Sequence, residues 1–187
     1  MQPEVLRTRR LDLSTPTTHD VDAIYEACQD AAVQRYTTVP SPYLRTDAER
    51  FVDLVQTWWQ DGETATWAIR HDGALVGMIG LARLVTGGPE IGYWVAESMR
   101  GRGVALEAAA AVIDWAFAPE RPQVERVEWR AVVGNIGSAR VAHRLGFRYE
   151  GMLRQALTNA LGRDDAWIAG LLRHDDRTPQ RWPVDLG

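Results

Sequence analysis

Two arginines alternate with two glycines near the middle of the chain, in the run Arg100-Gly101-Arg102-Gly103. The run separates a strand-like segment from a long alanine-rich segment that is typical of a helix. Glycine permits backbone conformations closed to other residues and lets a ligand approach closely. The first amides of a helix have no partner within it, and the helix dipole adds positive potential there. The run therefore predicts an anion site suited to a pyrophosphate, with both arginines as further ligands.

The same residues would also serve as a flexible helix start with two solvated arginines, and taken alone they leave both interpretations open. Two other phosphate-binding motifs are excluded. No Gly-Lys-Ser/Thr ending follows, as a P-loop requires, and the third glycine of the dinucleotide-binding fingerprint is missing. That fingerprint would also need a parallel sheet that starts earlier in the chain.

Other kinds of chemistry find little support. All 21 basic residues are arginine, which excludes a Schiff-base lysine or a lysine base. No Gly-x-Ser-x-Gly nucleophile elbow occurs, and the single cysteine, Cys28, belongs to the first predicted helix, so a covalent intermediate is not expected. We predict no metal site, because the histidines match no ligand spacing; they are His19, His71, His143 and His174.

Bulk properties are those of an ordinary globular protein. The 187 residues fit one domain, 1–187, with an ordered core of about 6–174 and a loose tail, 175–187, that holds two prolines. A formal charge of −4 argues against nucleic acid as a partner. The most apolar stretch, 104–118, contains two acidic residues and is too short to cross a bilayer, so no membrane partner is expected. One cysteine and no signal peptide indicate a cytoplasmic protein.

Periodicity and turn signals predict the order strand, two helices, three strands, helix, strand, helix, two strands. The predicted strands are 6–14, 65–70, 75–84, 90–96, 124–133, 147–153 and 165–173, and the predicted helices are 17–28, 46–60, 104–117 and 137–145. The order predicts an α/β protein of α+β type, with a mostly antiparallel seven-stranded sheet and about four helices on its faces. The strand–helix–strand unit in the second half supplies one parallel pair.

The pattern Arg100-x-x-Gly103-x-Ala105 resembles the acetyl-CoA pyrophosphate loop of the GNAT superfamily of N-acetyltransferases. Three more segments, in the same order, are similar to the RimJ/RimL-like branch of that superfamily. They are residues 6–11, residues 90–95, and residues 135–142 with Leu145-Gly146-Phe147. The likeness runs from about Leu6 to Arg173. It implies a GNAT-like sheet that splays between its fourth and fifth strands.

The resemblance further implies that acetyl-CoA is the co-substrate and that its pantetheine arm lies between the splayed strands. The backbone near Val95 would pair with that arm and stabilise the oxyanion, while the side chains of residues 93–95 are expected in the core. Ser138 would lie near the thioester sulfur and protonate the thiolate, although it could also be an ordinary helix-cap residue, as could Asn135. The implied cofactor-binding residues are Trp94, Val95, Arg100, Gly101, Arg102, Gly103, Val104, Ala105, Asn135 and Ser138.

An amine acceptor must lose a proton before it attacks. Glu90 is the leading candidate for the base, directly or through water, and Glu150 is a weaker one; a solvated, inert carboxylate is the alternative for Glu90. Ser138 is the second candidate catalytic residue. Because no nucleophile for a covalent intermediate is evident, we expect direct transfer in a ternary complex.

The acceptor is expected to enter from the opposite side of the sheet, past residues 33–45 and 158–164. A protein N-terminal α-amine is the leading acceptor, and a homodimer is possible. Small amines, antibiotics, a succinyl donor and a non-catalytic CoA-binding regulatory module are the alternatives.

Overall fold

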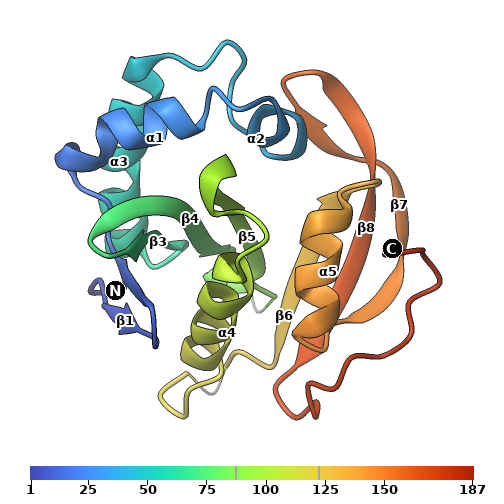
Figure 1. Ribbon diagram of the computed structural model, residues 1–187. Helices are drawn as coiled ribbons and strands as arrows, with labels where there is room; N and C mark the ends of the chain where they lie inside the picture. The colour runs from blue at the N-terminus through green and yellow to red at the C-terminus, as the bar shows by residue number, and fades with distance from the viewer. Residues whose placement is uncertain (87, 122) are drawn as a thin grey trace.

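The computed structural model describes the whole chain except Gly87 and Pro122 (Figure 1). Its strands form one sheet in the order β1-β2-β3-β4-β5-β6-β8-β7. The strands are β1 (Leu6–Arg7), β2 (Leu11–Ser14), β3 (Ala65–His71), β4 (Ala74–Ala82), β5 (Glu90–Val95), β6 (Arg126–Val132), β7 (Arg148–Asn159) and β8 (Gly162–Leu172). The helices are α1 (Val21–Ala27), α2 (Ala31–Tyr36), α3 (Arg45–Asp61), α4 (Val104–Ala116) and α5 (Ile136–Arg144).

Neighbouring strands are antiparallel except β5 and β6, which are parallel and joined through α4. These two strands pair only at Glu90 with Glu128 and at Ile91 with Trp129, and among the described residues their pairing ends there. The predicted fold class and the parallel pair are confirmed. The predicted splay between the fourth and fifth expected strands lies here, between β5 and β6.

The sheet carries helices on both faces. Along β3, Trp67 and Ile69 belong to the core that includes α4, whereas Ala68 between them packs with residues of α1 and α3. Because side chains alternate along a strand, α4 lies on one face, and α1 and the first half of α3 lie on the other. Later in α3, Val55 and Trp59 join the core that includes α4. α5 packs beside α4 on the first face, against β6. None of the helices in the described part of the chain has the length and hydrophobicity that a bilayer crossing requires.

The first predicted strand, 6–14, proves to be two strands joined by a turn. Thr8 causes the break, because its Oγ1 accepts a hydrogen bond from the Leu11 backbone nitrogen at 2.9 Å. The hairpin explains why the described sheet has eight strands where seven were predicted.

A fifth helix, α2, was also not predicted. Asp30 caps it by accepting a hydrogen bond from the Val33 backbone nitrogen at 2.9 Å. At six residues, α2 is too short to show a periodic apolar stripe.

The C-terminal tail, expected to be loose, packs on the body of the protein. Trp182 is buried, its ring lies 5.6 Å from that of Trp129, and its Nε1 donates to the Phe147 carbonyl at 3.0 Å. Arg140 on α5 donates to the Leu186 carbonyl at 2.5 Å. The prolines in this segment therefore do not prevent docking, because one large aromatic side chain supplies the apolar contact.

Candidate active site

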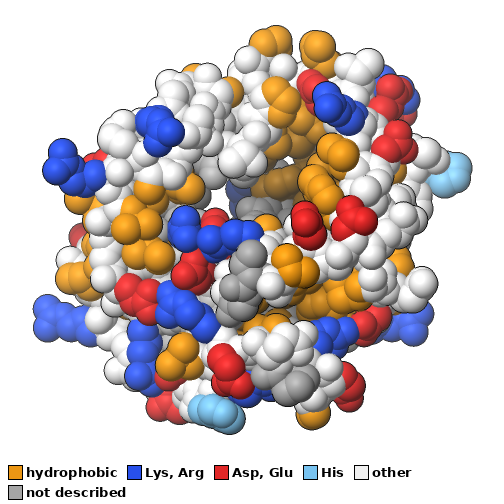
Figure 2. All heavy atoms as spheres, turned by 180° about the vertical axis from the view of Figure 1, so that it is seen from behind, with side chains coloured by type: hydrophobic (Ala, Val, Ile, Leu, Met, Phe, Trp, Pro, Cys, Tyr) orange, Lys and Arg blue, Asp and Glu red, His pale blue; other side chains and the backbone are white. Residues whose placement is uncertain are grey.

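A cleft of about 920 Å³ opens where β5 and β6 diverge. Seen from behind, the surface is hollowed near its centre, and basic and acidic side chains gather beside the hollow (Figure 2). Every residue predicted to bind the cofactor lines this cleft except Arg102, and so does Glu90. The lining positions are Glu90, Trp94, Val95, Arg100, Gly101, Gly103, Val104, Ala105, Asn135 and Ser138. Residues far apart in sequence thus meet at one opening.

The glycine turn enters α4 through two left-handed residues, Gly101 with φ of 73° and Gly103 with φ of 77°. Such φ values strain any residue with a side chain, which explains both glycines. Gly103 is the N-cap of α4, and as glycine it offers no side chain to bond the first helical amides. Those amides therefore remain available to an anion, at the positive end of the helix dipole.

Arg100 points toward other protein groups. Its Nε donates to the Val95 carbonyl at 3.0 Å, and its guanidinium pairs with Asp30 at 2.6 Å. The hydrogen bond from Arg100 is the main cause that lowers the pKa of Asp30. An anion at the turn would compete with Asp30 for this arginine. We therefore expect the amides of α4, rather than Arg100, to be the primary ligands of an anion at the turn.

The backbone of β5 opens toward the gap. The Ala96 nitrogen donates to the Val76 carbonyl at 2.9 Å, and Val95 lies opposite Gly77 in register. In an antiparallel pair this alternation turns the backbone groups of Tyr93 and Val95 away from β4. The backbone groups of Tyr93 and the Val95 nitrogen therefore face the gap beyond Ile91, as an edge that an extended amide ligand can complete, while the Val95 carbonyl is already paired with Arg100.

Ser138 lies in the first turn of α5, where Asn135 is the N-cap and accepts from the Ser138 nitrogen at 3.2 Å. The Ser138 hydroxyl oxygen accepts from Trp129 Nε1 at 3.0 Å and donates to the Tyr93 hydroxyl at 3.0 Å. The Tyr93 hydroxyl in turn donates to the Ser138 carbonyl at 3.1 Å. Ser138 is thus fixed by partners from two strands, β5 and β6.

Tyr93 is a polar site residue that the sequence did not reveal, because it was interpreted as core. Burial raises its pKa to about 12, against the opposing hydrogen bonds to Ser138 and Trp129. The phenol therefore stays protonated and able to donate at neutral pH. The signal available in sequence was only an aromatic residue in a strand, which packing explains equally well.

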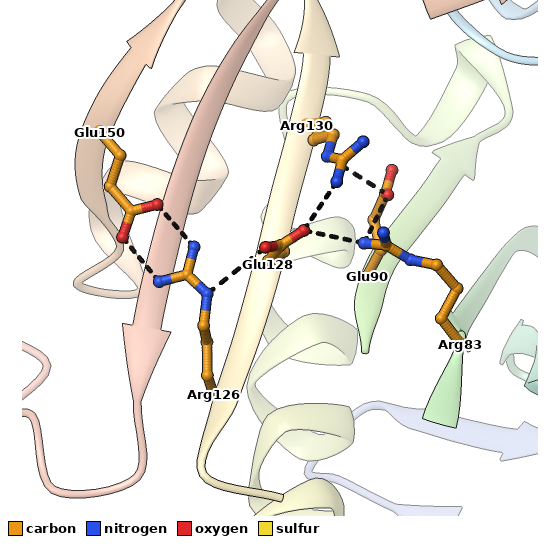
Figure 3. Close-up of polar contacts among 6 residues, drawn as sticks. All are labelled: Arg83, Glu90, Arg126, Glu128, Arg130 and Glu150. Carbon is orange, nitrogen blue, oxygen red and sulfur yellow. Dashed lines mark hydrogen bonds and ion pairs between the residues drawn. The ribbon is translucent and has the colours of Figure 1, made fainter. Parts of the chain in front are cut away.

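Glu90 belongs to an ionic cluster of three arginines and three glutamates on the face opposite α4 (Figure 3). The cluster consists of Arg83, Glu90, Arg126, Glu128, Arg130 and Glu150. Glu90 lies 3.0 Å from the Arg83 guanidinium and 3.6 Å from Arg130 Nε. Both arginines also pair with Glu128, at 2.8 and 3.0 Å. Glu150, the weaker candidate base, makes a double hydrogen bond with Arg126 instead and does not line the cleft.

Burial raises the pKa of Glu90, and the charges of Arg130 and Arg83 only partly oppose this effect. The nearby carboxylate of Glu128 raises it further. A carboxylate with a raised pKa is a better proton acceptor than an ordinary surface carboxylate. The surroundings of Glu90 at the start of β5 therefore raise its affinity for a proton, as a general base requires.

The predicted acceptor side also lines the cleft, through residues 36–39 at and after the end of α2 and through Thr158 and Asn159 at the end of β7. Arg35 of α2 pairs with Asp164 of β8 at 2.7 Å and links these two walls. No group of three or more histidine, cysteine or acidic side chains that could hold a metal occurs among the residues outside positions 87 and 122.

Residues 10–148 match the acetyltransferase (GNAT) domain family. The putative ribosomal N-acetyltransferase YdaF of Bacillus subtilis (strain 168) is 39% identical over 106 residues, which cover 55% of this chain and 57% of YdaF. The ribosomal-protein-serine acetyltransferase of Escherichia coli (strain K12) is 33% identical over 99 residues, 52% of this chain and 54% of that protein. These matches span little more than half the length of either relative.

Among solved structures, RimJ of Mycobacterium smegmatis in complex with CoA-disulfide shares the fold. Its TM-score is 0.82 at 22% identity, over 92% of this chain and 90% of that chain. The family match covers most of the chain and includes the glycine turn, the diverging strands and Ser138. The chain belongs to the GNAT acetyltransferase family.

Proposed function

We propose that this protein transfers an acetyl group from acetyl-CoA to a primary amine, and that the amine is a protein N-terminal α-amine. The observation that carries the proposal is the single cleft shared by the glycine turn, the open edge of β5, Ser138 and Glu90. Membership of the GNAT family supports the reaction type.

The donor half of the cleft suits acetyl-CoA. The free amides at the start of α4 bind the pyrophosphate, and Gly101 leaves the space next to them open, since a Cβ there would meet nothing within 4 Å. The pantetheine amides pair with the backbone of Tyr93 and Val95. The Val95 nitrogen then lies close to the thioester carbonyl and stabilises the oxyanion.

The acceptor half supplies the proton transfer. Glu90, directly or through one water, takes a proton from the ammonium group, and the neutral amine attacks the thioester carbonyl. A carbon–nitrogen bond forms, the carbon–sulfur bond breaks, and the second proton of the attacking nitrogen passes through the Ser138 hydroxyl to the CoA thiolate, which leaves as the thiol. The Tyr93 hydroxyl can turn from the Ser138 carbonyl to the Ser138 hydroxyl as the latter turns to sulfur.

The names of the relatives support a protein acceptor. YdaF is described as a putative ribosomal N-acetyltransferase, and the Escherichia coli relative acetylates a serine of a ribosomal protein. We expect the chain terminus to enter between residues 36–39 and the end of β7, which line the cleft.

Two measurements test the proposal. Acetyl-CoA at millimolar concentration should raise the melting temperature, because a ligand that binds only the folded state stabilises it. CoA release should then accompany turnover of N-terminal peptides, and Glu90→Gln should lower kcat about 100-fold while acetyl-CoA binding is kept. Glu125→Gln is the matched control, since Glu125 is exposed on the approach to β6. The absence of a melting shift would contradict the donor assignment, and binding without turnover would indicate a regulatory CoA-binding module instead.

A further inference from the structure

Gly92 is exposed although β5 lies in the interior of the sheet, with β4 on one side and β6 on the other. Its φ lies outside the left-handed region, so the backbone does not require glycine. A Cβ built at Gly92 would meet no atom within 4 Å, and the residue lines the cleft. The missing side chain therefore leaves open space that a ligand can use.

The neighbouring strands bound this space. Gly92 pairs with Gly80 of β4, and Gly80 pairs with Thr66 of β3. The space over Gly80 is already filled, because a Cβ there would lie 3.0 Å from Thr66 Oγ1 and 2.9 Å from the Ala65 carbonyl oxygen, so the open floor is centred on Gly92. This floor lies on the face opposite α4, because Ile91 next to Gly92 packs in the core that includes α4. It is thus on the acceptor side of the gap.

Aromatic side chains of α3 form another part of the cleft lining. Phe51 and Trp58 of α3 line the same cleft, and their rings meet edge to face at 6.0 Å. α3 is fixed on this face by Val52, which packs in one cluster with Ala68 of β3 and Met78 of β4. The hollow bounded by Gly80, Gly92, Phe51 and Trp58 is called the glycine hollow below. Its walls favour an apolar group.

One edge of the glycine hollow is charged. Glu90 precedes Gly92 by two residues and points to the same face, which places their Cα atoms about 7 Å apart. A large apolar side chain on the carbon that carries the amine spans most of that separation. A ligand whose amine contacts Glu90 therefore presents its neighbouring side chain to the hollow.

We propose that the glycine hollow is a subsite for the acceptor, and that it takes an apolar side chain carried by the carbon next to the reacting amine. The inference rests on the proposed function, because it assumes that the amine contacts Glu90. The acceptor class is then an α-amine whose first side chain is large and apolar, as in a peptide that begins with leucine or phenylalanine. A terminal glycine leaves the hollow unfilled.

Peptides that differ only in their first residue test the subsite. With the CoA-bound protein, calorimetry should show that a Leu-initiated peptide binds at least about tenfold more tightly than its Gly-initiated counterpart, as filling an apolar pocket predicts. Turnover with acetyl-CoA should show the same ratio in kcat/KM. The binding measurement does not depend on catalysis, so failure of the proposed function and failure of the subsite are separable.

Gly92→Val fills the hollow with a residue that strands accommodate readily. It should abolish the preference for the Leu-initiated peptide and leave the affinity for acetyl-CoA and for the Gly-initiated peptide unchanged. Gly92→Ala should reduce the preference for the Leu-initiated peptide partly. It keeps the test available if the valine variant does not fold. Ala74→Val is the control, because Ala74 is an exposed β4 residue that does not line the cleft. Equal binding of both peptides to the unaltered protein, or equal loss of both in Gly92→Val, would overturn the proposal.

Discussion

Glu90 owes its ionisation behaviour to particular neighbours, and those neighbours can be removed one at a time. Burial raises the pKa of this carboxyl, whereas Arg130 and Arg83 oppose the increase. Arg126 belongs to the same ionic cluster but pairs with Glu128 and Glu150 rather than with Glu90. The cluster therefore contains both a test residue and a matched control.

Arg130→Gln should move the acid limb of the kcat/KM profile to higher pH, by up to about one unit. The base must be deprotonated to act, and loss of a cation 3.6 Å away raises the pKa of Glu90 further. The measurement is the pH dependence of kcat/KM with a saturating donor. Arg126→Gln should leave the limb in place. A limb that is unchanged or moves to lower pH in Arg130→Gln would argue against Glu90 as the base.

The features of the candidate site that could be predicted from sequence are those set by local backbone geometry. The glycine turn and the Asn135 cap are readable because each depends on a few adjacent residues. The partners of Ser138 were not readable, since Tyr93 lies 45 positions away and joins it only when β5 and α5 come together. The Asp30 partner of Arg100 lies 70 positions away for the same reason.

At the scale of elements, the N-terminus of α4 is held by the hairpin turn between β1 and β2. Glu107, in the first turn of α4, accepts hydrogen bonds from Thr8 Oγ1 at 2.6 Å and from Arg10 Nε at 2.8 Å. Arg10 also donates to the Arg102 carbonyl in the glycine turn, at 3.2 Å. Burial tends to raise the pKa of Glu107, but the bonds from Thr8 and Arg10 outweigh it and lower the pKa. The hairpin thereby fixes the shape of the anion site.

Glu107→Gln separates two effects of opposite sign. Loss of a negative charge near the site would by itself strengthen CoA binding. Loss of the charge-assisted bonds to the hairpin should loosen the glycine turn and weaken it. We expect the loss of the hairpin contacts to have the larger effect, so that the Kd for CoA, measured by calorimetry, rises about three- to tenfold. Asp114→Asn, on the exposed side of the same helix, should leave the Kd unchanged. Tighter CoA binding in Glu107→Gln would show that the hairpin does not shape the turn.

The elements that sequence missed have physical reasons in common. The β1–β2 hairpin depends on one threonine hydroxyl, and its alternation alone fits a single strand equally well. α2 has six residues and is defined by its cap and by its ion pair to β8 rather than by periodicity. The long, strongly patterned elements, α3 and α4, were predicted nearly to their ends.

For the molecule as a whole, the cleft exists because two parts of the sheet diverge. β1 to β5 with α4 form one part, and β6, β8 and β7 with α5 form the other, and β5 and β6 pair at only two positions. The tail packs on the second part through Trp182, against Trp129 and Tyr149, and it also reaches the first part, where Arg177 pairs with Asp114 of α4 at 2.6 Å. Trp129 also donates to Ser138, so the tail supports a residue of the site from behind.

Trp182→Ala should therefore affect both stability and the site. Removing a buried tryptophan costs about 3 kcal/mol, or roughly 10 °C in melting temperature for a domain of this size. Leu161→Ala, at an exposed position between β7 and β8, should change the melting temperature by little. If the tail only adds stability, kcat below the melting transition should match that of the unaltered protein. We expect kcat to fall severalfold, because Trp129 loses its backing and Ser138 loses a fixed donor. If Trp182→Ala melted at the same temperature as Leu161→Ala, the tail would contribute no stability and would be the loose segment that its prolines suggest.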